Sequence, residues 1–289
     1  MSLKFTVGDL TIHRIIEQET TFLPALEMLP GLTPEVLAEN RAWMQNAGAL
    51  DDKDVLILCF QSYVVKTPHH TILIDSCIGN DKPRPQRPKW NMKTDDTYAH
   101  ALAAAGISVG DIDYVMCTHL HVDHVGWNTK LVDGRWVPTY PNARYVFGQH
   151  EYNYWAAHSD TASHLAVFND SVKPIADAGL MDLVASDAQL SDEVTLIPTP
   201  GHSPGHMSVH IKSAGEEALL TGDAAHHPVQ MAHLDWSSTA DADPLQSAVS
   251  RRALFSRFAD TPTLVIGGHF GAGHIMREGD AFRFAALQH

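Results

Sequence analysis

The chain carries short apolar runs separated by turn-forming residues, and several of these runs alternate apolar with polar positions. Such runs predict β-strands, whereas apolar positions recurring every three or four residues predict helices. Strands are expected near residues 5–17, 55–66, 71–74, 111–118, 144–147, 181–184, 194–197, 207–212, 218–223 and 263–266. Helices are expected near residues 33–45, 96–105, 149–158 and 162–178. A hairpin with an Asp-Gly turn is expected over residues 132–137.

The stretch 18–33 departs from this pattern, because its apolar side chains are interspersed with Pro24 and Pro30. It is too apolar for a solvated loop and too rich in proline for a helix. A helix is expected to follow, capped by Thr33 and running to about Gln45. The whole segment either packs against the core or a dimer partner, or it forms a lid over an apolar substrate. Both interpretations remain open.

Four metal-binding side chains, His119, His121, Asp123 and His124, lie within six residues directly after the apolar run 112–117. On an extended segment, residues two apart point the same way, so the first three would share one face. A turn into a helix near Asp123 would place His124 on the other side of the same pocket. This geometry suits two metal ions rather than one. Surface histidines at a strand end are the alternative, which four ligand types after one apolar strand disfavour.

Further candidate ligands also follow apolar strands. His202 lies in a turn rich in proline and glycine, Asp223 ends the next strand pair, and His269 follows the last predicted strand. Neutral imidazoles combined with carboxylates favour Zn²⁺, while Mn²⁺, Fe²⁺ and Co²⁺ also suit nitrogen and oxygen sites. Asp75 likewise ends an apolar strand, and a buried acid there is costly unless it is paired. Alternatively, Asp75 simply opens the next turn.

The order His-x-His-x-Asp-His, then a histidine, an aspartate and a histidine, resembles the signature of the metallo-β-lactamase superfamily. The resemblance runs from about Val55 to His274. It implies an α/β fold of the αββα sandwich type, with two mixed β-sheets face to face, helices on the outer faces and the metals at the sandwich edge. We expect a single domain over residues 1–289, with 18–50 as an extension that acts as a lid or a dimer contact.

The resemblance also implies a role for each ligand. The seven expected metal ligands are His119, His121 and His202 for one ion, Asp123, His124 and His269 for the other, and Asp223 as the bridge. A hydroxide shared by the two ions would attack a lactone or ester carbonyl, and Asp123 would align the attacking water. Asp75 would orient a metal-bound histidine from behind. No serine or cysteine nucleophile is required.

Two further stretches, 222–230 and 268–275, resemble the lactonase and methyl-parathion-hydrolase-like branch of the superfamily. Many homoserine-lactone lactonases carry a tyrosine three residues past the bridging aspartate, where this chain has His226. A neutral imidazole there can donate to the substrate oxyanion, or it is simply a packed or solvent-facing histidine. This departure puts narrow acyl-homoserine-lactone specificity in doubt. The remaining candidate pocket residues are Phe270, His274 and Trp90, and the last of these either lines a substrate entrance or anchors its loop.

Composition limits the kinds of partner and the compartment that are expected for this protein. With 20 basic against 34 acidic residues, the net charge of −14 argues against a nucleic-acid partner. No run approaches the roughly 20 apolar residues of a membrane helix, and the start lacks the apolar core of a signal peptide, so a cytoplasmic protein is expected. The three cysteines are expected to be free and buried. Nineteen histidines exceed what packing requires, which again indicates metal chemistry.

These observations predict a dinuclear metal-dependent hydrolase, a possible homodimer, that acts on an apolar lactone or ester, with phosphotriesters as additional substrates. A β-lactamase-type or thioesterase-type hydrolase on the same metal centre is the alternative enzyme. Only 20 residues follow His269, which weakens the resemblance to thioesterases with a C-terminal helical region. The non-enzymatic alternative is a metal-stabilised binding module. It predicts damaged ligands, and every expected ligand is present.

Overall fold

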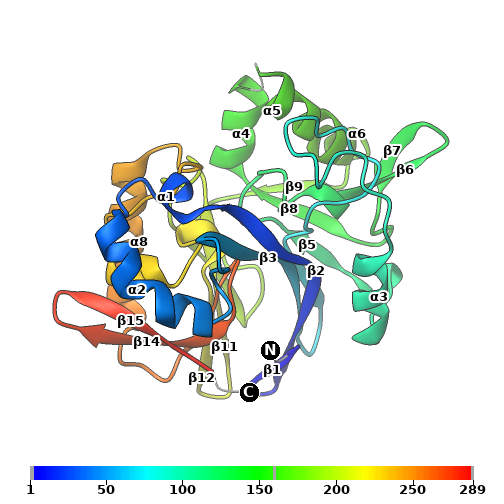
Figure 1. Ribbon diagram of the computed structural model, residues 1–289. Helices are drawn as coiled ribbons and strands as arrows, with labels where there is room; N and C mark the ends of the chain where they lie inside the picture. Colours follow the sequence, from blue (N-terminus) through cyan, green and yellow to red (C-terminus); the bar gives the residue numbers. More distant parts are fainter. Residues whose placement is uncertain (1–2, 159–160, 288–289) are drawn as a thin grey trace. The chain divides into compact units, whose positions relative to one another are not determined.

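The longest run of paired strands is a seven-stranded sheet in the computed structural model, which describes residues 3–158 and 161–287 (Figure 1). Its order is β1-β2-β3-β4-β5-β8-β9. The strands are β1 (Lys4–Val7), β2 (Leu10–Pro24), β3 (Val55–Lys66), β4 (Thr71–Ile74), β5 (Tyr114–Met116), β8 (Arg144–Gly148) and β9 (Met181–Val184). The pairs β1–β2 and β3–β4 are antiparallel, whereas β4, β5, β8 and β9 run parallel. The strands expected near 55–66 and 71–74 are therefore present, and they pair with each other.

A second sheet has six strands in the order β10-β11-β12-β13-β14-β15. They are β10 (Val194–Pro198), β11 (Met207–Ser213), β12 (Glu216–Leu220), β13 (Leu264–Ile266), β14 (Ala272–Glu278) and β15 (Ala281–Ala286). Only the β12–β13 pair is parallel among these neighbours. A small hairpin joins β6 (Thr129–Val132) to β7 (Arg135–Pro138), and its turn residues Asp133 and Gly134 both have positive φ, as the Asp-Gly sequence predicts.

Helices lie between the strands. The α-helices are α1 (Ala25–Met28), α2 (Pro34–Asn46), α3 (Thr97–Ala104), α4 (Gln149–His158), α5 (Ala162–Val167), α6 (Lys173–Asp177), α7 (Val229–Ala232) and α8 (Pro244–Phe258). The short turns are η1 (Val109–Asp111), η2 (Gly126–Asn128), the π-helix η3 (Phe168–Val172) and η4 (Gly222–Ala224). In the part of the chain described, none of these helices is long and apolar enough to cross a membrane.

The segment 18–33 differs from its expectation. The strand β2 continues to Pro24, and α1 forms one helical turn between the two prolines. The turn is possible because Pro24 precedes its first residue, where a missing N–H costs nothing. The next helix agrees with the sequence, since Thr33 accepts a bond from the Val36 N–H at the start of α2.

The chain divides into two compact units. One contains Glu19–Cys59 and Gln189–His289, and the other contains Ser2–Gln18 and Phe60–Ala188. The expected single domain over 1–289 therefore stays a prediction, and its two end residues lie outside the described part of the chain.

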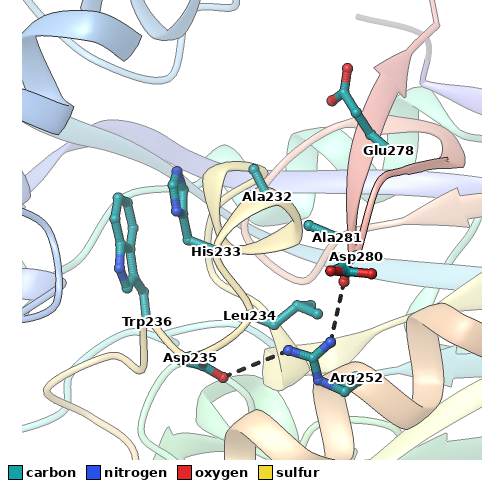
Figure 2. Close-up of a pocket in the computed structure, with 9 residues that line it drawn as sticks. All are labelled: Ala232, His233, Leu234, Asp235, Trp236, Arg252, Glu278, Asp280 and Ala281. Carbon is teal, nitrogen blue, oxygen red and sulfur yellow. Dashed lines mark hydrogen bonds and ion pairs between the residues drawn. The ribbon is translucent and has the colours of Figure 1, made fainter.

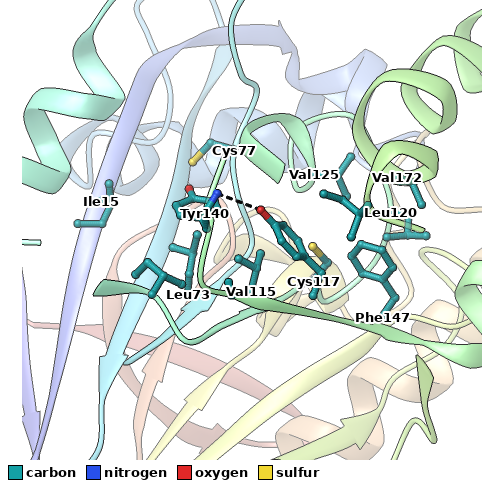
Figure 3. Packing of buried hydrophobic residues seen from close by; sticks show 14 of the residues in the cluster. Ile15, Leu73, Cys77, Val115, Cys117, Leu120, Val125, Tyr140, Phe147 and Val172 are labelled. Carbon is teal, nitrogen blue, oxygen red and sulfur yellow. Dashed lines mark hydrogen bonds between the residues drawn. The ribbon is translucent and has the colours of Figure 1, made fainter. Parts of the chain in front are cut away.

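Each unit has its own apolar core. In the second unit, Leu73, Val115 and Phe147 from three parallel strands pack with Leu120 and Val125 of the segment that follows β5 (Figure 3). Because Leu120 and Val125 are buried in this core, they hold the segment that follows β5 in place. In the first unit, the corresponding cluster contains Leu219 and Val265 of β12 and β13, packed with residues of α8.

Two large sheets, each with parallel and antiparallel pairs, accompanied by helices, confirm the expected fold class. The three cysteines are buried thiols outside any disulfide bond, as expected.

Candidate metal centre

The segment after β5 gathers the histidines of its motif. The ring of His119 lies 4.6 Å from that of His121 and 4.1 Å from that of His124, measured between centroids. A carboxylate oxygen of Asp123 lies 3.7 Å from His124 Nε2. His119 and His124 are buried, while the other two side chains are partly exposed. The four predicted ligands of this unit therefore lie close together.

Asp75 supports this cluster from behind. It follows β4 with a positive φ of 58° and accepts hydrogen bonds from the backbone N–H and the hydroxyl of Thr118. Its other oxygen lies 2.9 Å from His124 Nδ1. A proton on Nδ1 would donate to this carboxylate and leave the Nε2 lone pair for a metal. The contact is the one expected of an orienting residue.

In the other unit, His202 lies in a tight turn after β10. Gly201 has a φ of +132°, and a Cβ on it would lie 2.2 Å from the Ser247 backbone nitrogen, so only glycine fits. The His202 Nδ1 lies 2.9 Å from an oxygen of Asp241, which leaves Nε2 directed toward Asp223. Burial opposes ionisation of Asp241, but the bond with His202 and nearby positive groups bring its pKa to about 2.

Asp223 stands at the turn η4 directly after β12, and three imidazoles converge on it. Its Oδ2 lies 3.3 Å from His202 Nε2, 3.2 Å from His226 Nε2 and 3.1 Å from His269 Nε2. Burial lowers the pKa of His226, so this ring favours its neutral form, in which each nitrogen is either a donor or a lone pair. Lone pairs and carboxylate oxygens in one small buried volume suit a divalent cation. The donor set therefore fits the metals that the sequence predicts.

His269 completes this unit's set. Its Nδ1 lies 3.1 Å from the Cys59 carbonyl oxygen, which again leaves Nε2 for Asp223. The preceding Gly268 is required, because a Cβ there would lie 2.7 Å from the Gly222 carbonyl oxygen. The two strand ends that carry Asp223 and His269 can approach each other only without that side chain.

His226 is buried, so the solvent-facing interpretation of its role is wrong. Its ring stacks on His269 at 5.6 Å with an interplanar angle of 4°. Its backbone N–H donates to the Gln230 side chain, which fixes the turn. Its Nδ1 is buried and has no hydrogen-bond partner among the described residues. The second nitrogen is therefore available to another group.

The remaining predicted pocket residues lie as follows. Trp90 is buried, donates from Nε1 to Gln18 and packs edge-on against Phe60, contacts that favour loop anchoring over a substrate entrance. Phe270 is buried and contacts Phe284. His274 lies on β14 with its Nδ1 3.0 Å from the Thr263 carbonyl oxygen. A direct role of these residues toward a substrate stays a prediction.

Sequence reasoning missed Asp241 and its neighbour Arg251, whose guanidinium lies 3.6 Å from the Asp241 carboxylate. Arg251 lies on the buried face of α8. Ser247 precedes it by four residues on this face, and Leu254 and Phe255 follow it by three and four residues. A charged residue at a core position of an amphipathic helix was the signal that could have found it.

A cavity of about 310 Å³ lies elsewhere in the same unit (Figure 2). Arg252 reaches across its edge toward Asp235 and the Asp280 carbonyl, and His233 stacks on Trp236 at 3.7 Å. None of the site residues predicted from the sequence lines this cavity.

Comparison with known proteins points to one family. The family model described as the metallo-beta-lactamase superfamily matches residues 61–269. The N-acyl homoserine lactonase AttM of Azorhizobium caulinodans is 30% identical over 62% of this chain and 65% of its own length. The lactonase of the same name from Rhizobium radiobacter is 31% identical over 43% of this chain and 46% of its own length. The chain thus spans between about half and two thirds of these relatives, and the predicted resemblance to the lactonase branch is confirmed.

Solved structures agree on the fold. A hydrolase of the β-lactamase superfamily, AbOPH, superposes with a TM-score of 0.82 at 22% identity, covering 99% of this chain and 97% of its own. AidC, a dizinc quorum-quenching lactonase in complex with a product, superposes with a TM-score of 0.80 at 20% identity over the same shares. The matched family model, the ligand order and the fold together establish that the chain belongs to the metallo-β-lactamase superfamily.

Proposed function

We propose that this protein is a metal-dependent hydrolase that cleaves lactones or carboxylic esters. The observation that carries the proposal is the convergence of three imidazole Nε2 atoms on one buried oxygen of Asp223. Membership of the superfamily supports it, and so do relatives named N-acyl homoserine lactonase. His226 stands at the third position after Asp223, and on this basis we propose a broader lactone and ester range rather than narrow acyl-homoserine-lactone specificity.

The ligand assignment is part of the proposal. We propose two divalent ions, with Zn²⁺ as the first choice and Mn²⁺, Fe²⁺ or Co²⁺ as alternatives. Their ligands would be His119, His121 and His202 for one ion, Asp123, His124 and His269 for the other, and Asp223 for both. Support comes from the way each unit groups its own share of these side chains and from the contacts of Asp75, Asp241 and the Cys59 carbonyl with ligand Nδ1 atoms.

The protein's own groups would then perform three tasks. When bound, the metal ions would supply Lewis acidity and lower the pKa of a water molecule toward neutrality. The Asp123 carboxylate would accept a hydrogen bond from the attacking water and align it with the carbonyl carbon. A neutral His226 has one N–H, which would donate to the negative charge that develops on the substrate oxygen. The ring stack with His269 and the Gln230 bond would hold that donor in place.

The segment 18–50 is proposed to act as a lid or a dimer contact. Trp43 of α2 is 38% exposed, and its ring lies 6.1 Å from that of His227, the residue after His226. This contact favours the lid. Light scattering of the purified chain would separate the two roles, because a monomer of 31.7 kDa excludes the dimer contact.

The testing experiment measures metal content by elemental analysis and, on the same sample, hydrolysis of a γ-lactone, an aryl ester and an aryl phosphotriester. We expect two metals per chain and lactone or ester turnover that a chelator abolishes. Two metals without such turnover would direct the search to thioesters and β-lactams. Less than one metal per chain, unchanged by added Zn²⁺ or Mn²⁺, would overturn the proposal.

A further inference from the structure

A carboxylate far along the chain holds His202 from behind. The Asp241 Oδ1 lies 2.9 Å from His202 Nδ1, and both side chains are almost completely buried. The backbone reinforces this contact, because the Ala242 N–H donates to the His202 carbonyl and the Asp243 N–H donates to the Gly201 carbonyl. The segment that carries Asp241 is therefore fixed along the turn that carries the ligand.

The second oxygen of Asp241 is also fixed. It accepts a hydrogen bond of 3.1 Å from the Ser238 N–H and lies 3.6 Å from Arg251 Nη2. A carboxylate held on both oxygens cannot rotate away from the imidazole. The His202 ring therefore has one favoured orientation and one favoured tautomer, with the proton on Nδ1 and the lone pair on Nε2.

Arg251 links this carboxylate to the turn of Asp223. Its Nε donates to the Ala224 carbonyl at 2.8 Å, one residue after Asp223. Its Nη1 donates to the carbonyls of Leu234 and Trp236, and its Nη2 donates to the Ser247 hydroxyl. Burying a guanidinium completely is costly unless its donors are satisfied, and here every nitrogen has a partner. One side chain thus joins the segment behind His202 to the segment of the proposed bridging carboxylate.

We propose that Asp241 is the positioning residue of His202 and that Arg251 sets the spacing between His202 and Asp223. The proposal rests on the proposed function, because it assigns both residues to the metal centre. Asp241 fixes the direction of the Nε2 lone pair. Arg251 fixes the distance between the two turns. Their combined effect is a half-site preorganised for a divalent cation.

The test compares Zn²⁺ affinity in the full chain, by chelator competition, for wild type, Asp241→Ala, Asp241→Asn and the control Asp243→Ala. Asp243 lies two residues from Asp241, and its side chain accepts from the Gln246 N–H at the start of α8, the helix that carries Arg251. Its loss therefore weakens this helix without removing a side chain that contacts His202. We expect affinity to fall on the order of 10- to 100-fold for Asp241→Ala. The Zn²⁺ affinity of Asp241→Asn should fall less, because the amide oxygen of the asparagine still accepts a hydrogen bond from His202 Nδ1. The control should bind as wild type does.

A second readout follows the His202 ring itself. In the metal-free chain at pH 8, two-bond ¹H–¹⁵N correlations distinguish the two imidazole tautomers, and a His202→Gln spectrum assigns the signal. We expect the His202 ring to carry its proton on Nδ1 in wild type, and we expect the tautomer with the proton on Nε2 to become more populated in Asp241→Ala. If Asp241→Ala fails to fold, Asp241→Asn supplies both measurements, and Arg251→Lys, which keeps the charge but loses the planar fork, should weaken Zn²⁺ binding in the same direction.

Unchanged affinity and an unchanged tautomer in the Asp241 variants would overturn the positioning role. Equal weakening in Asp243→Ala would also overturn it, because helix destabilisation would then explain the loss. These outcomes are distinct from failure of the proposed function. A wild type that binds Zn²⁺ but hydrolyses no lactone or ester would remove the activity and leave the positioning role intact, whereas a wild type that binds no Zn²⁺ would remove both.

Discussion

At the scale of single residues, His226 shares the Asp223 carboxylate with two proposed metal ligands but keeps Nδ1 for another partner. If the one N–H of the neutral His226 ring donates to charge that develops only in the transition state, loss of the ring should affect turnover rather than substrate binding. We expect His226→Ala to lower kcat roughly 10- to 1,000-fold with little change in KM. Steady-state kinetics on a γ-lactone and metal analysis of the same preparation measure this effect.

A matched control is available in the same unit. His210 is also a buried histidine, but it pairs with Glu217 across β11 and β12. His210→Asn should therefore leave kcat unchanged. An unchanged kcat in metal-replete His226→Ala would assign that residue to the scaffold instead.

The neighbouring His227 supplies a prediction about pH. Burial lowers its pKa to about 4, although a bond to the Ala49 backbone opposes the shift. The folded state thus favours the neutral ring, while the unfolded chain titrates near 6.5. Above pH 6.5 both states hold a neutral ring and stability is unaffected. As the pH falls from 6.5 toward 4, only the unfolded chain gains the proton, so the free energy of unfolding falls by up to about 3 kcal/mol.

Urea unfolding of the chelated protein at pH 7.5 and pH 4.5 measures this loss. Between the two pH values, the free energy of unfolding of His227→Gln should fall by roughly 2–3 kcal/mol less than that of wild type. His100→Gln removes an exposed histidine and should behave as wild type. Equal losses in wild type and His227→Gln would show that His227 is not the group responsible.

The seven expected ligands stay a prediction, and they could be named from the sequence because each follows an apolar strand and a local pattern of turn residues. Asp241 could not be named in this way, because it lies 39 positions from His202 in the sequence. The core position of Arg251 on α8 was a signal for its burial, but its contact with Ala224, 27 positions away, was not visible. Asp241 follows no strand, and an arginine on a helix is most often solvated. Only the folded chain shows that the guanidinium is enclosed by carbonyl groups.

At the scale of elements, the helix expected over 162–178 shows where local pattern fails. The structure breaks it into α5, the π-helix η3 and α6. Pro174 has no N–H to offer the Asp170 carbonyl four residues before it. That carbonyl instead accepts from the Thr129 hydroxyl and from Lys82, which are distant in the sequence. The proline was visible in the sequence, but the partners that stabilise the break were not.

The side chain of Asp170 supplies the prediction for this element. It binds Arg84 through both oxygens at 2.7 and 2.8 Å and lies 3.5 Å from Lys82, all three residues being buried. Asp170→Ala would leave two buried cations without their anion, so we expect a loss of about 3–5 kcal/mol in the free energy of unfolding.

Urea denaturation measures this loss, with Lys82→Met as the comparison. Burial lowers the Lys82 pKa to about 8, which shows that its charge is disfavoured there, and its removal leaves the Arg84–Asp170 pair intact. Lys82→Met should therefore cost far less. A loss below about 1 kcal/mol for Asp170→Ala would mean that solvent reaches the cations after the substitution.

At the scale of the whole molecule, the chain is divided into its two compact units within β2, within β3 and between β9 and β10. A net charge of −14 adds repulsion that two divalent cations would partly offset. An ion that binds the folded chain but not the unfolded one stabilises folding by mass action, by about 2.7 kcal/mol at a free concentration 100 times Kd. We therefore expect chelation to lower Tm and added Zn²⁺ to restore it.

Asp223→Ala tests whether this stabilisation acts through the proposed bridge. The variant should lose metal and most hydrolytic activity, and its Tm should no longer respond to chelator or to added Zn²⁺. Asp235→Ala, at an exposed carboxylate in the same unit, should keep the full response. Differential scanning calorimetry with parallel metal analysis measures both effects. Retention of two metals with full turnover in Asp223→Ala would refute the bridging role, because the remaining proposed ligands would then hold both cations without the carboxylate that they share.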